Sequence, residues 1–396
     1  MKNIIFVIPT LGNGGAEKSL LAVLQNIDYS EYNVDIFSLR PTGLIADMIP
    51  DKVNVLPLSD SFTNFKLPLG QSVKRDIKKL KFCQAYNRIM YSVVLRKYNM
   101  TNRAEQYAFK YLKRFIGNNF KHYDAGIGYL EKTSNYIVSE VIDADVKIGY
   151  IHSDYNKLQM DKCMDEDLMR GLNYLVTVSD TCAEILKEAL PGFSEKVRVI
   201  ENIIDKNKLM MQAREENPFD DNFNGTRIVT VGRVSHEKGP DIALEACRIL
   251  VACGCKIKWH MIGAVDDLSI KEKIKAYCLE EIFFLEGLHK NPYKYVFNSD
   301  IYVQPSRYEG KSIAIEEAKV LEIPIVTTGF TTAFSQISEG LTGLIADEIS
   351  GQALASAIKR LINDHELYCR LKENLKEESG NTDELKKLTA LIEDRK

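Results

Sequence analysis

The sequence predicts an α/β protein with two lobes, each built on a parallel β-sheet that carries helices on both faces. Short apolar segments typical of buried strands alternate along the chain with segments of helical periodicity. The length of 396 residues exceeds one ordinary core, because domains mostly hold about 100–200 residues. A polar stretch without periodicity at 201–225 supplies the expected linker.

The predicted elements follow this division. The first lobe, residues 1–200, begins with a glycine-rich turn and a helix after its first strand, and carries a basic helical insertion at 66–121. Its expected strands cover 4–9, 34–39, 124–130, 147–152 and 174–178. In the second lobe, residues 226–372, strands are expected at 227–231, 258–262, 282–285, 301–304 and 323–327. The tail 373–396 is charged and predicted to be helical, with packing back across the linker as one arrangement to test.

The composition is ordinary for a globular protein, with 45% hydrophobic and 27% charged residues. No uncharged apolar run approaches the roughly 18 residues of a membrane-spanning helix. The N-terminal apolar segment lacks a signal-peptide cleavage site, so we expect a cytoplasmic protein. The 8 cysteines are scattered without a CxxC pair, which favours reduced thiols over disulfides or a zinc site.

The insertion at 66–121 concentrates positive charge. It holds 14 Lys and Arg against two acids, Asp76 and Glu105, for a local charge of +12; since the whole chain carries −3, the remainder carries −15. Nine Phe and Tyr residues are interspersed. Basic, aromatic, helical sequence favours docking on an anionic membrane surface. A nucleic-acid patch has a similar pattern and a solvated helical face is the simplest alternative; we expect the membrane and no nucleic acid.

The segment 306–318 carries most of the chemistry. It follows an apolar run and precedes another, which predicts a strand, a turn, a helix and the next strand. Glu309 falls in the turn, and Glu317 lies about two helical turns further on, so both carboxylates can reach one ligand. Backbone N–H groups at the start of the helix favour an anion. Carboxylates can accept hydrogen bonds from sugar hydroxyls, and backbone amides can donate to phosphates. A site with both groups suits a sugar nucleotide.

This segment resembles the E-x7-E signature of retaining glycosyltransferases of family 4, in a form typical of bacterial surface-polysaccharide enzymes, and the resemblance extends from Ile4 to about Leu361. It implies the GT-B fold, with two doubly wound Rossmann-like domains that face an interdomain cleft. The domain 1–200 would bind the acceptor and the domain 226–372 the nucleotide sugar. By the same resemblance, Glu317 would bind the ribose and Glu309 a sugar hydroxyl, with further donor contacts from Gly310, Lys311, Ser312 and Ile313.

A second basic element lies between a predicted strand and the helix 240–252. Gly232 permits close backbone approach to a ligand, and Arg233 and Lys238 can hold a diphosphate. The spacing resembles the G-R-x4-K-G element of family 4, which implies that Arg233 and Lys238 neutralise the departing nucleotide. A solvated loop is the alternative for this segment.

Two candidates lie in the first lobe. Gly14 and Gly15 belong to a G-G-A-E sequence that resembles the family's loop over the donor phosphates, although an ordinary tight turn has the same composition. His152 follows a predicted strand, where ligand groups gather in open α/β sheets. The resemblance places it beside the donor sugar, so Glu309, His152, Arg233 and Lys238 are the predicted catalytic residues. A lone histidine is more often structural.

The expected activity is therefore a retaining hexosyl or N-acetylhexosaminyl transfer. The donor is expected to be a UDP-sugar and the acceptor a polyprenyl-diphosphate-linked glycan at the inner face of the cytoplasmic membrane. Two D-x-D triplets, 143–145 and 165–167, lack a convincing strand end, so we expect no metal and no cofactor. Two alternatives stay open: a sugar-nucleotide 2-epimerase of the same fold, and a non-catalytic partner of an active transferase.

Overall fold

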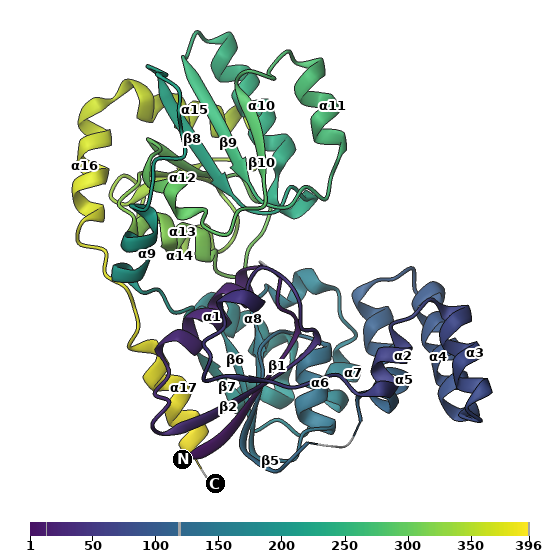
Figure 1. The fold of residues 1–396 in the computed structure, drawn as a ribbon. Coiled ribbons are helices and arrows are strands. Elements are labelled where there is room, and N and C mark those ends of the chain that lie inside the picture. The colour runs from purple at the N-terminus through teal and green to yellow at the C-terminus, as the bar shows by residue number, and fades with distance from the viewer. Residues whose placement is uncertain (13, 118–119, 395–396) are drawn as a thin grey trace. The chain divides into compact units, whose positions relative to one another are not determined.

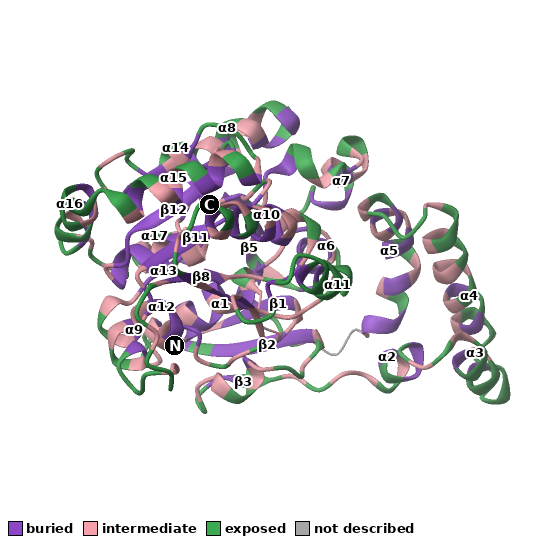
Figure 2. Ribbon diagram, turned by 90° about the horizontal axis from the view of Figure 1, so that it is seen from above, coloured by how far each residue is buried: buried purple, intermediate pink, exposed green. Residues whose placement is uncertain are grey.

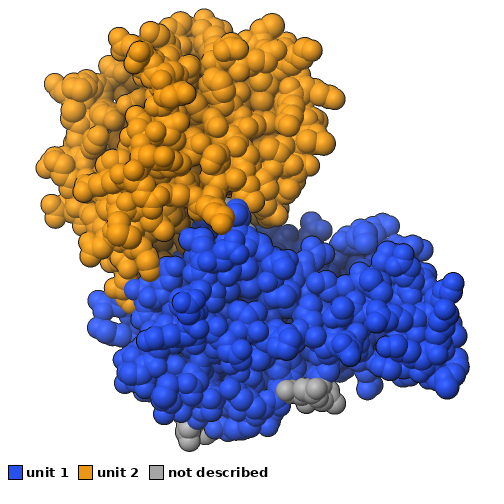
Figure 3. All heavy atoms as spheres, viewed as in Figure 1, with its two compact units in different colours: residues 1–202, 383–396 blue, residues 203–382 orange. Residues whose placement is uncertain are grey.

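A computed structural model describes residues 1–12, 14–117 and 120–394 of the chain. The chain divides into two compact units, shown in different colours in Figure 3. Unit 1 comprises residues 1–202 and 383–396, and unit 2 comprises residues 203–382. Each unit contains its own sheet, and every pairing between its described strands is parallel. The predicted α/β class with two doubly wound domains is confirmed.

Unit 1 has a sheet of 7 strands among the described residues, in the order β3-β2-β1-β4-β5-β6-β7. The strands are β1 (Lys2–Thr10), β2 (Tyr32–Arg40), β3 (Asn54–Val55), β4 (Tyr123–Gly128), β5 (Ala144–Ile151), β6 (Tyr174–Thr177) and β7 (Val197–Val199). The helices are α1 (Gly15–Asn26), α2 (Asp60–Phe65), α3 (Leu69–Lys78), α4 (Phe82–Lys97), α5 (Asn102–Ile116), α6 (Thr133–Glu140), α7 (Lys162–Leu168), α8 (Asp180–Ala189) and α17 (Glu384–Glu393), with short 3-10 turns η1 (Ala46–Met48), η2 (Tyr155–Leu158) and η3 (Pro191–Lys196) (Figure 1).

Unit 2 has a sheet of 6 strands in its described residues, in the order β10-β9-β8-β11-β12-β13. The strands are β8 (Thr226–Val231), β9 (Ile257–Ile262), β10 (Phe283–Gly287), β11 (Ile301–Gln304), β12 (Ile325–Thr328) and β13 (Gly343–Ala346). The helices are α9 (Lys206–Ala213), α10 (Pro240–Ala252), α11 (Ser269–Ala276), α12 (Tyr293–Phe297), α13 (Ile313–Val320), α14 (Ala333–Gln336), α15 (Gly351–Asn363) and α16 (His365–Leu375), with the 3-10 turn η4 (His236–Lys238).

The unit 2 sheet is apolar on both faces, which explains why its strands read as continuous hydrophobic runs. Successive side chains of a strand point to opposite faces. Ile228 belongs to an apolar cluster with Leu250 and Leu354, whereas the next residue, Val229, belongs to a second cluster with Ile315. Helices therefore cover both faces, as the doubly wound class requires.

The chain returns to unit 1 through α17. Tyr32 donates a hydrogen bond to Glu393 at 3.1 Å, and Tyr174 donates one to Asp394. The backbone N–H of Glu201 donates to Glu384 at 2.9 Å. The end of the described chain is thereby attached to strands β2 and β6 and to the last loop of unit 1.

Two sequence expectations differ from the structure. The stretch 201–225 contains helix α9, whose N-terminus is capped by Asp205, with a carboxylate oxygen 3.1 Å from the N–H of Lys208. Its periodicity was too short to recognise, because only Leu209 and Ala213 are buried. The strands β3, β7 and β13 were also missed; β3 and β7 hold only 2 and 3 residues, too few for a recognisable alternation. None of the helices in the described ranges is long and apolar enough to cross a bilayer.

Candidate functional site

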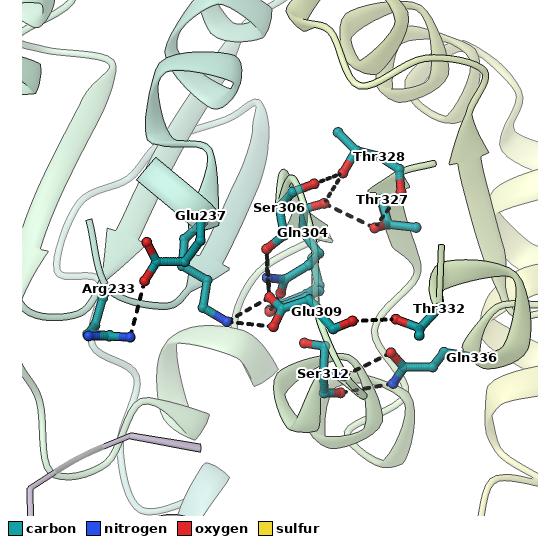
Figure 4. Close-up of polar contacts among 12 residues, drawn as sticks. Arg233, Glu237, Gln304, Ser306, Glu309, Ser312, Thr327, Thr328, Thr332 and Gln336 are labelled. Atoms are coloured by element: carbon teal, nitrogen blue, oxygen red, sulfur yellow. Dashed lines mark hydrogen bonds and ion pairs between the residues drawn. The ribbon is translucent and has the colours of Figure 1, made fainter. Parts of the chain in front are cut away.

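Glu309 lies in the turn between β11 and α13, and its carboxylate is held by three side chains (Figure 4). Oε1 accepts hydrogen bonds from Ser306 Oγ at 2.7 Å and from Gln304 Nε2 at 3.1 Å. The Nζ of Lys238 lies 2.6 Å from Oε1 and 2.8 Å from Oε2. The Glu309 side chain is 11% exposed. This carboxylate is thus fixed in position by the protein alone.

Lys238 comes from the loop after β8, and a glycine brings that loop against the Glu309 turn. Gly239 has a φ of +61°, and a Cβ there would lie 2.0 Å from the carbonyl oxygen of Pro305. Only glycine fits this backbone and this contact. A backbone bond of 2.8 Å from the N–H of Arg307 to the carbonyl of Glu237 joins the same two segments.

Arg307 adds a second connection between these segments. Its guanidinium holds Asp241 with two bonds of 2.9 and 2.6 Å and also donates to the carbonyl of His236 at 2.8 Å. The paired guanidinium holds the pKa of Asp241 below its usual range. Paired bonds of this kind fix geometry as well as charge, so Arg307 helps to set the distance between Lys238 and Glu309.

Arg233 is placed differently from Lys238, although both come from the same loop. Its side chain is 56% exposed and contacts Glu237 at 3.1 Å. An exposed ion pair of this kind contributes little, about 0–1 kcal/mol. The guanidinium is therefore available to an incoming anion at little cost, whereas Lys238 is already engaged with Glu309.

Gln336 connects α14 to the start of α13, and sequence reasoning missed it. Its Oε1 accepts the N–H of Ser312 at 2.9 Å, and its Nε2 donates to the carbonyl of Ser312 at 3.0 Å and to Glu316 at 2.8 Å. The predicted ligand contact from the Ser312 N–H would require this bond to open. The corresponding contacts from Gly310, Lys311 and Ile313 stay predictions.

Glu317 is buried in α13, 4% exposed, and accepts a hydrogen bond from Tyr293 Oη at 2.8 Å. The neighbouring Glu316 instead pairs with Lys319 at 3.4 Å. Burial raises the pKa of Tyr302 on β11, and the charges of Glu317 and Glu309 raise it further. That Glu309 and Glu317 reach one ligand stays a prediction.

The glycines of the first predicted loop lie at the start of α1. Gly14 is the N-cap of the helix and Gly15 its first residue. A Cβ on Gly14 would lie 2.3 Å from a carboxylate oxygen of Glu17. Asn13 of the same motif lies outside the described residues. The donor-phosphate role of Gly14 and Gly15 stays a prediction.

His152 follows β5 directly, and its ring is buried against Tyr150, with centroids 5.5 Å apart and an interplanar angle of 19°. Its Nε2 is buried and makes no hydrogen bond of normal geometry with a described residue, although the Asn202 side chain and the Tyr129 backbone lie close to the ring. Burial lowers the pKa of His152, although the nearby carboxylate of Glu131 opposes the shift. A neutral ring with one unpaired nitrogen can accept or donate one proton or hydrogen bond.

Glu131, which sequence reasoning did not select, holds the segment that carries His152. Its Oε2 accepts the backbone N–H of His152 at 3.1 Å, and its Oε1 accepts the Ser153 hydroxyl at 2.7 Å. The position directly after the predicted strand 124–130 was the available signal. Asp154 caps the turn η2 by accepting the N–H of Asn156 at 3.0 Å.

The D-x-D triplets have other partners. Asp143 and Asp145 both contact His122, at 3.1 and 3.2 Å. Asp165 is buried and accepts hydrogen bonds from Tyr136, Tyr155 and Gln106. In the described ranges, no group of three or more His, Cys, Asp and Glu side chains is placed to hold a metal ion.

The whole chain has the GT-B fold of solved glycosyltransferases. HepE from Anabaena, solved in complex with UDP and glucose, is 17% identical and matches with a TM-score of 0.71, covering 100% of both chains. A glycosyltransferase from Rickettsia africae, also 17% identical, matches with a TM-score of 0.69 over 100% of this chain and 98% of its own. At such identities the likeness shows the fold alone.

Sequence similarity is concentrated in unit 2. Residues 212–378 match the family model of glycosyl transferases group 1. The capsular polysaccharide biosynthesis glycosyltransferase CapM of Staphylococcus aureus is 29% identical over 178 residues, which are 44% of this chain and 46% of CapM. The chain thus spans about half the length of this curated relative. The range of the family match includes Arg233, Lys238, Glu309 and Glu317, and it excludes His152.

Proposed function

We propose that the protein is a glycosyltransferase that takes a sugar from a nucleotide-sugar donor bound to unit 2. The observation that carries the proposal is the fixed carboxylate of Glu309, bonded to Lys238, Gln304 and Ser306 at the start of a helix that also carries Glu317. The match of residues 212–378 to glycosyl transferases group 1 supports the same activity.

In this proposal the donor diphosphate binds the two cations of the loop after β8. Arg233 leaves its exposed pair with Glu237. Lys238 has three N–H donors, so it can keep Glu309 and still donate to a phosphate oxygen. Glu309 accepts a hydroxyl of the transferred sugar, and Glu317 accepts a ribose hydroxyl. Charge that develops on the leaving diphosphate is then met by groups already in place, which is how preorganised sites lower a barrier.

We further propose that the transfer retains the anomeric configuration and requires no metal or other cofactor. The acceptor hydroxyl would attack from the side of the leaving diphosphate, whose oxygen takes the proton of that hydroxyl. His152, with its unpaired Nε2, would hydrogen-bond the donor sugar or assist the transfer. Arg233 and Lys238 would supply the positive charge that a metal ion provides elsewhere.

A UDP-sugar is the proposed donor, since HepE was solved with UDP and glucose, and the transferred group is a hexosyl or N-acetylhexosaminyl residue. The acceptor is proposed to be a polyprenyl-diphosphate-linked glycan of surface polysaccharide synthesis, as the name of CapM suggests. Such an acceptor places the enzyme at the inner face of the cytoplasmic membrane.

Calorimetry with a panel of UDP-, GDP- and ADP-sugars, without added metal, tests the donor site. We expect saturable binding of one UDP-sugar to the wild type and its loss, by about 100-fold or more in affinity, in Glu317→Ala. Glu322→Ala is the matched control, because this carboxylate ends the same helix region but pairs with Lys206 at 3.3 Å. Binding that survives in Glu317→Ala would contradict the assignment.

The two alternatives give different outcomes in the same series. A non-catalytic partner binds none of the sugars alone, although the folded protein is intact. A 2-epimerase binds a UDP-sugar and converts it to its epimer with no acceptor present, which product analysis of the titrated sample detects.

A further inference from the structure

The hairpin of α3 and α4 in unit 1 exposes an apolar strip. In α4 the side chains Phe82, Tyr86, Ile89 and Val93 recur at helical spacing and are 41–60% exposed. Leu80, between the two helices, is 76% exposed. Figure 2 shows α3 mostly exposed, and α4 as a mixture of exposed and intermediate residues. The strip is defined as the exposed apolar residues Ile77, Leu80, Phe82, Tyr86, Ile89 and Val93.

A groove between the two helices continues this strip. It has a volume of about 440 Å³ and is lined by Leu69, Val73, Ile77, Ile89, Gly70 and the stems of Lys74 and Lys78. Its walls are therefore almost entirely hydrocarbon, with ammonium groups at the rim. The lining of the groove suits acyl chains better than a polar ligand, because its walls offer almost no hydrogen-bond partners.

Unpaired positive charge surrounds the strip. Lys74, Arg75, Lys78, Lys79 and Lys81 are all exposed, and none forms an ion pair with a residue in the described ranges. The one acid of the hairpin, Asp76, is 2% exposed and bonded to Asn64 at 2.7 Å. The surface is thus apolar at its centre and positive at its rim.

The sequence predicted that the whole basic insertion, 66–121, docks on a membrane surface. The structure limits the exposed aromatic part of this surface to α4. Of the nine aromatic residues of the insertion, only Phe82 and Tyr86 are exposed, whereas Phe109 and Phe115 are fully buried. Helix α5 is attached to the rest of unit 1, since Gln106 bonds to Asp165 at 2.7 Å and Tyr107 to Asp161 at 2.5 Å. Helix α5 therefore anchors the insertion, and both exposed aromatic residues lie on α4.

The backbone at the tip supports an external partner for the strip. Leu80 has a φ of +57°, a region that bulky residues rarely adopt. A leucine there bears the cost of strain and of exposure, and Gly or Asn would avoid both. A strained, exposed leucine at the tip of a basic hairpin is explained if its side chain is buried in something outside the chain.

We propose that the α3–α4 face docks on an anionic lipid bilayer, with the apolar strip at the boundary between headgroups and acyl chains. The rim lysines then lie among anionic headgroups, which attract them. Single-stranded nucleic acid is held largely by stacking on aromatic rings. The groove has no aromatic lining residue and the strip is mostly aliphatic, which favours hydrocarbon over nucleic acid. Docking itself does not depend on the proposed function. Its biological role does, because docking would bring unit 1 to the surface that holds a lipid-linked acceptor.

Co-sedimentation with vesicles tests the proposal with the full chain. We expect binding to phosphatidylglycerol–phosphatidylcholine vesicles, little binding to pure phosphatidylcholine, and a decline as salt rises, because salt screens exposed charges. The double variant Leu80→Asn/Phe82→Ser should bind about tenfold more weakly. Both positions are exposed, and Asn tolerates the backbone at 80, so the fold is expected to persist. The matched control is Met211→Ser/Leu268→Ser, which removes equally exposed apolar groups from unit 2.

A second pair of variants separates charge from apolar contact. Lys74→Glu/Lys78→Glu should abolish binding at low salt, and Lys74→Arg/Lys78→Arg should retain it. Unchanged vesicle binding in Leu80→Asn/Phe82→Ser and in Lys74→Glu/Lys78→Glu would overturn the proposal. Equal binding to neutral vesicles or tighter binding to RNA would also overturn it. So would self-association through the strip, measured by light scattering. UDP-sugar calorimetry on the same variants should match the wild type, so a failure of docking and a failure of the donor site are distinguishable.

Discussion

Glu309 in unit 2 and His152 in unit 1 each follow a strand of a parallel sheet. The two side chains differ in the hydrogen bonds that they make within the protein. The Glu309 carboxylate is bonded to Lys238, Gln304 and Ser306. The His152 Nε2 is buried and makes no hydrogen bond of normal geometry with a described residue. The first group is positioned by side chains of its own unit, whereas the second has no comparable support. Substitutions should therefore affect the geometry of the turn in unit 2 and the protonation of a buried ring in unit 1.

The largest effect is expected from Glu309→Gln. The amide keeps the size of the side chain but removes the charge that Lys238 pairs with, and it brings an N–H₂ group toward donors. We expect turnover of the UDP-sugar to fall by about 100-fold or more, the scale for losing one preorganised polar contact at a reacting centre. Release of UDP measures it, with Glu322→Gln as the matched control. A variant with wild-type turnover would show that Glu309 is not at the reacting centre.

A smaller effect is expected from Gln336→Leu. This variant tests whether the turn between β11 and α13 depends on a residue for which no ligand contact is proposed. The change leaves the Ser312 N–H, now bonded at 2.9 Å, without its partner. An unpaired buried group of this kind costs about 1–3 kcal/mol. We expect a lower melting temperature and about tenfold weaker donor binding, measured by calorimetry. The same change at the exposed Gln352 is the control; equal effects at both positions would contradict the positioning role.

The smallest effect concerns pH and His152. Because burial lowers the pKa of His152 in the folded protein, the unfolded chain takes up a proton near pH 6.5 that the folded ring resists. This contribution to stability is present above that pH and is lost as the pH falls. Wild type should therefore lose stability on acidification more steeply than His152→Gln. Urea unfolding at pH 7.5 and pH 5.5 measures the difference; parallel losses would mean that the ring is solvated.

The fold class was predictable because strand and helix periodicities are local, and doubly wound sheets are apolar on both faces. The positions of Glu309 and Glu317 on a turn and the following helix were readable for the same reason. The Lys238–Glu309 pair was not, since 71 residues separate its members. Sequence reasoning placed both at one ligand but did not show that they hold each other.

The contacts that complete the site had no local signal. Gln336 lies 24 residues beyond Ser312 and belongs to a helix of 4 residues, α14. Tyr293 reaches Glu317 across 24 residues. Which aromatic residues of the insertion are buried was also not predictable, because helical periodicity does not show which face of a helix packs against its neighbours. Only Phe82 and Tyr86 of that set lie in water.

The division of the chain has a consequence for its synthesis. Unit 2 is continuous, and its two ends are paired, since the N–H of Ile204 donates to Asn381 at 2.7 Å and the N–H of Asn381 to the carbonyl of Ile204 at 3.0 Å. Unit 1 is interrupted, because α17 is translated only after all of unit 2. Domains usually fold as they leave the ribosome. Here the last helix of the first unit is synthesised after the second unit, so Tyr32 and Tyr174 meet their carboxylate partners only then.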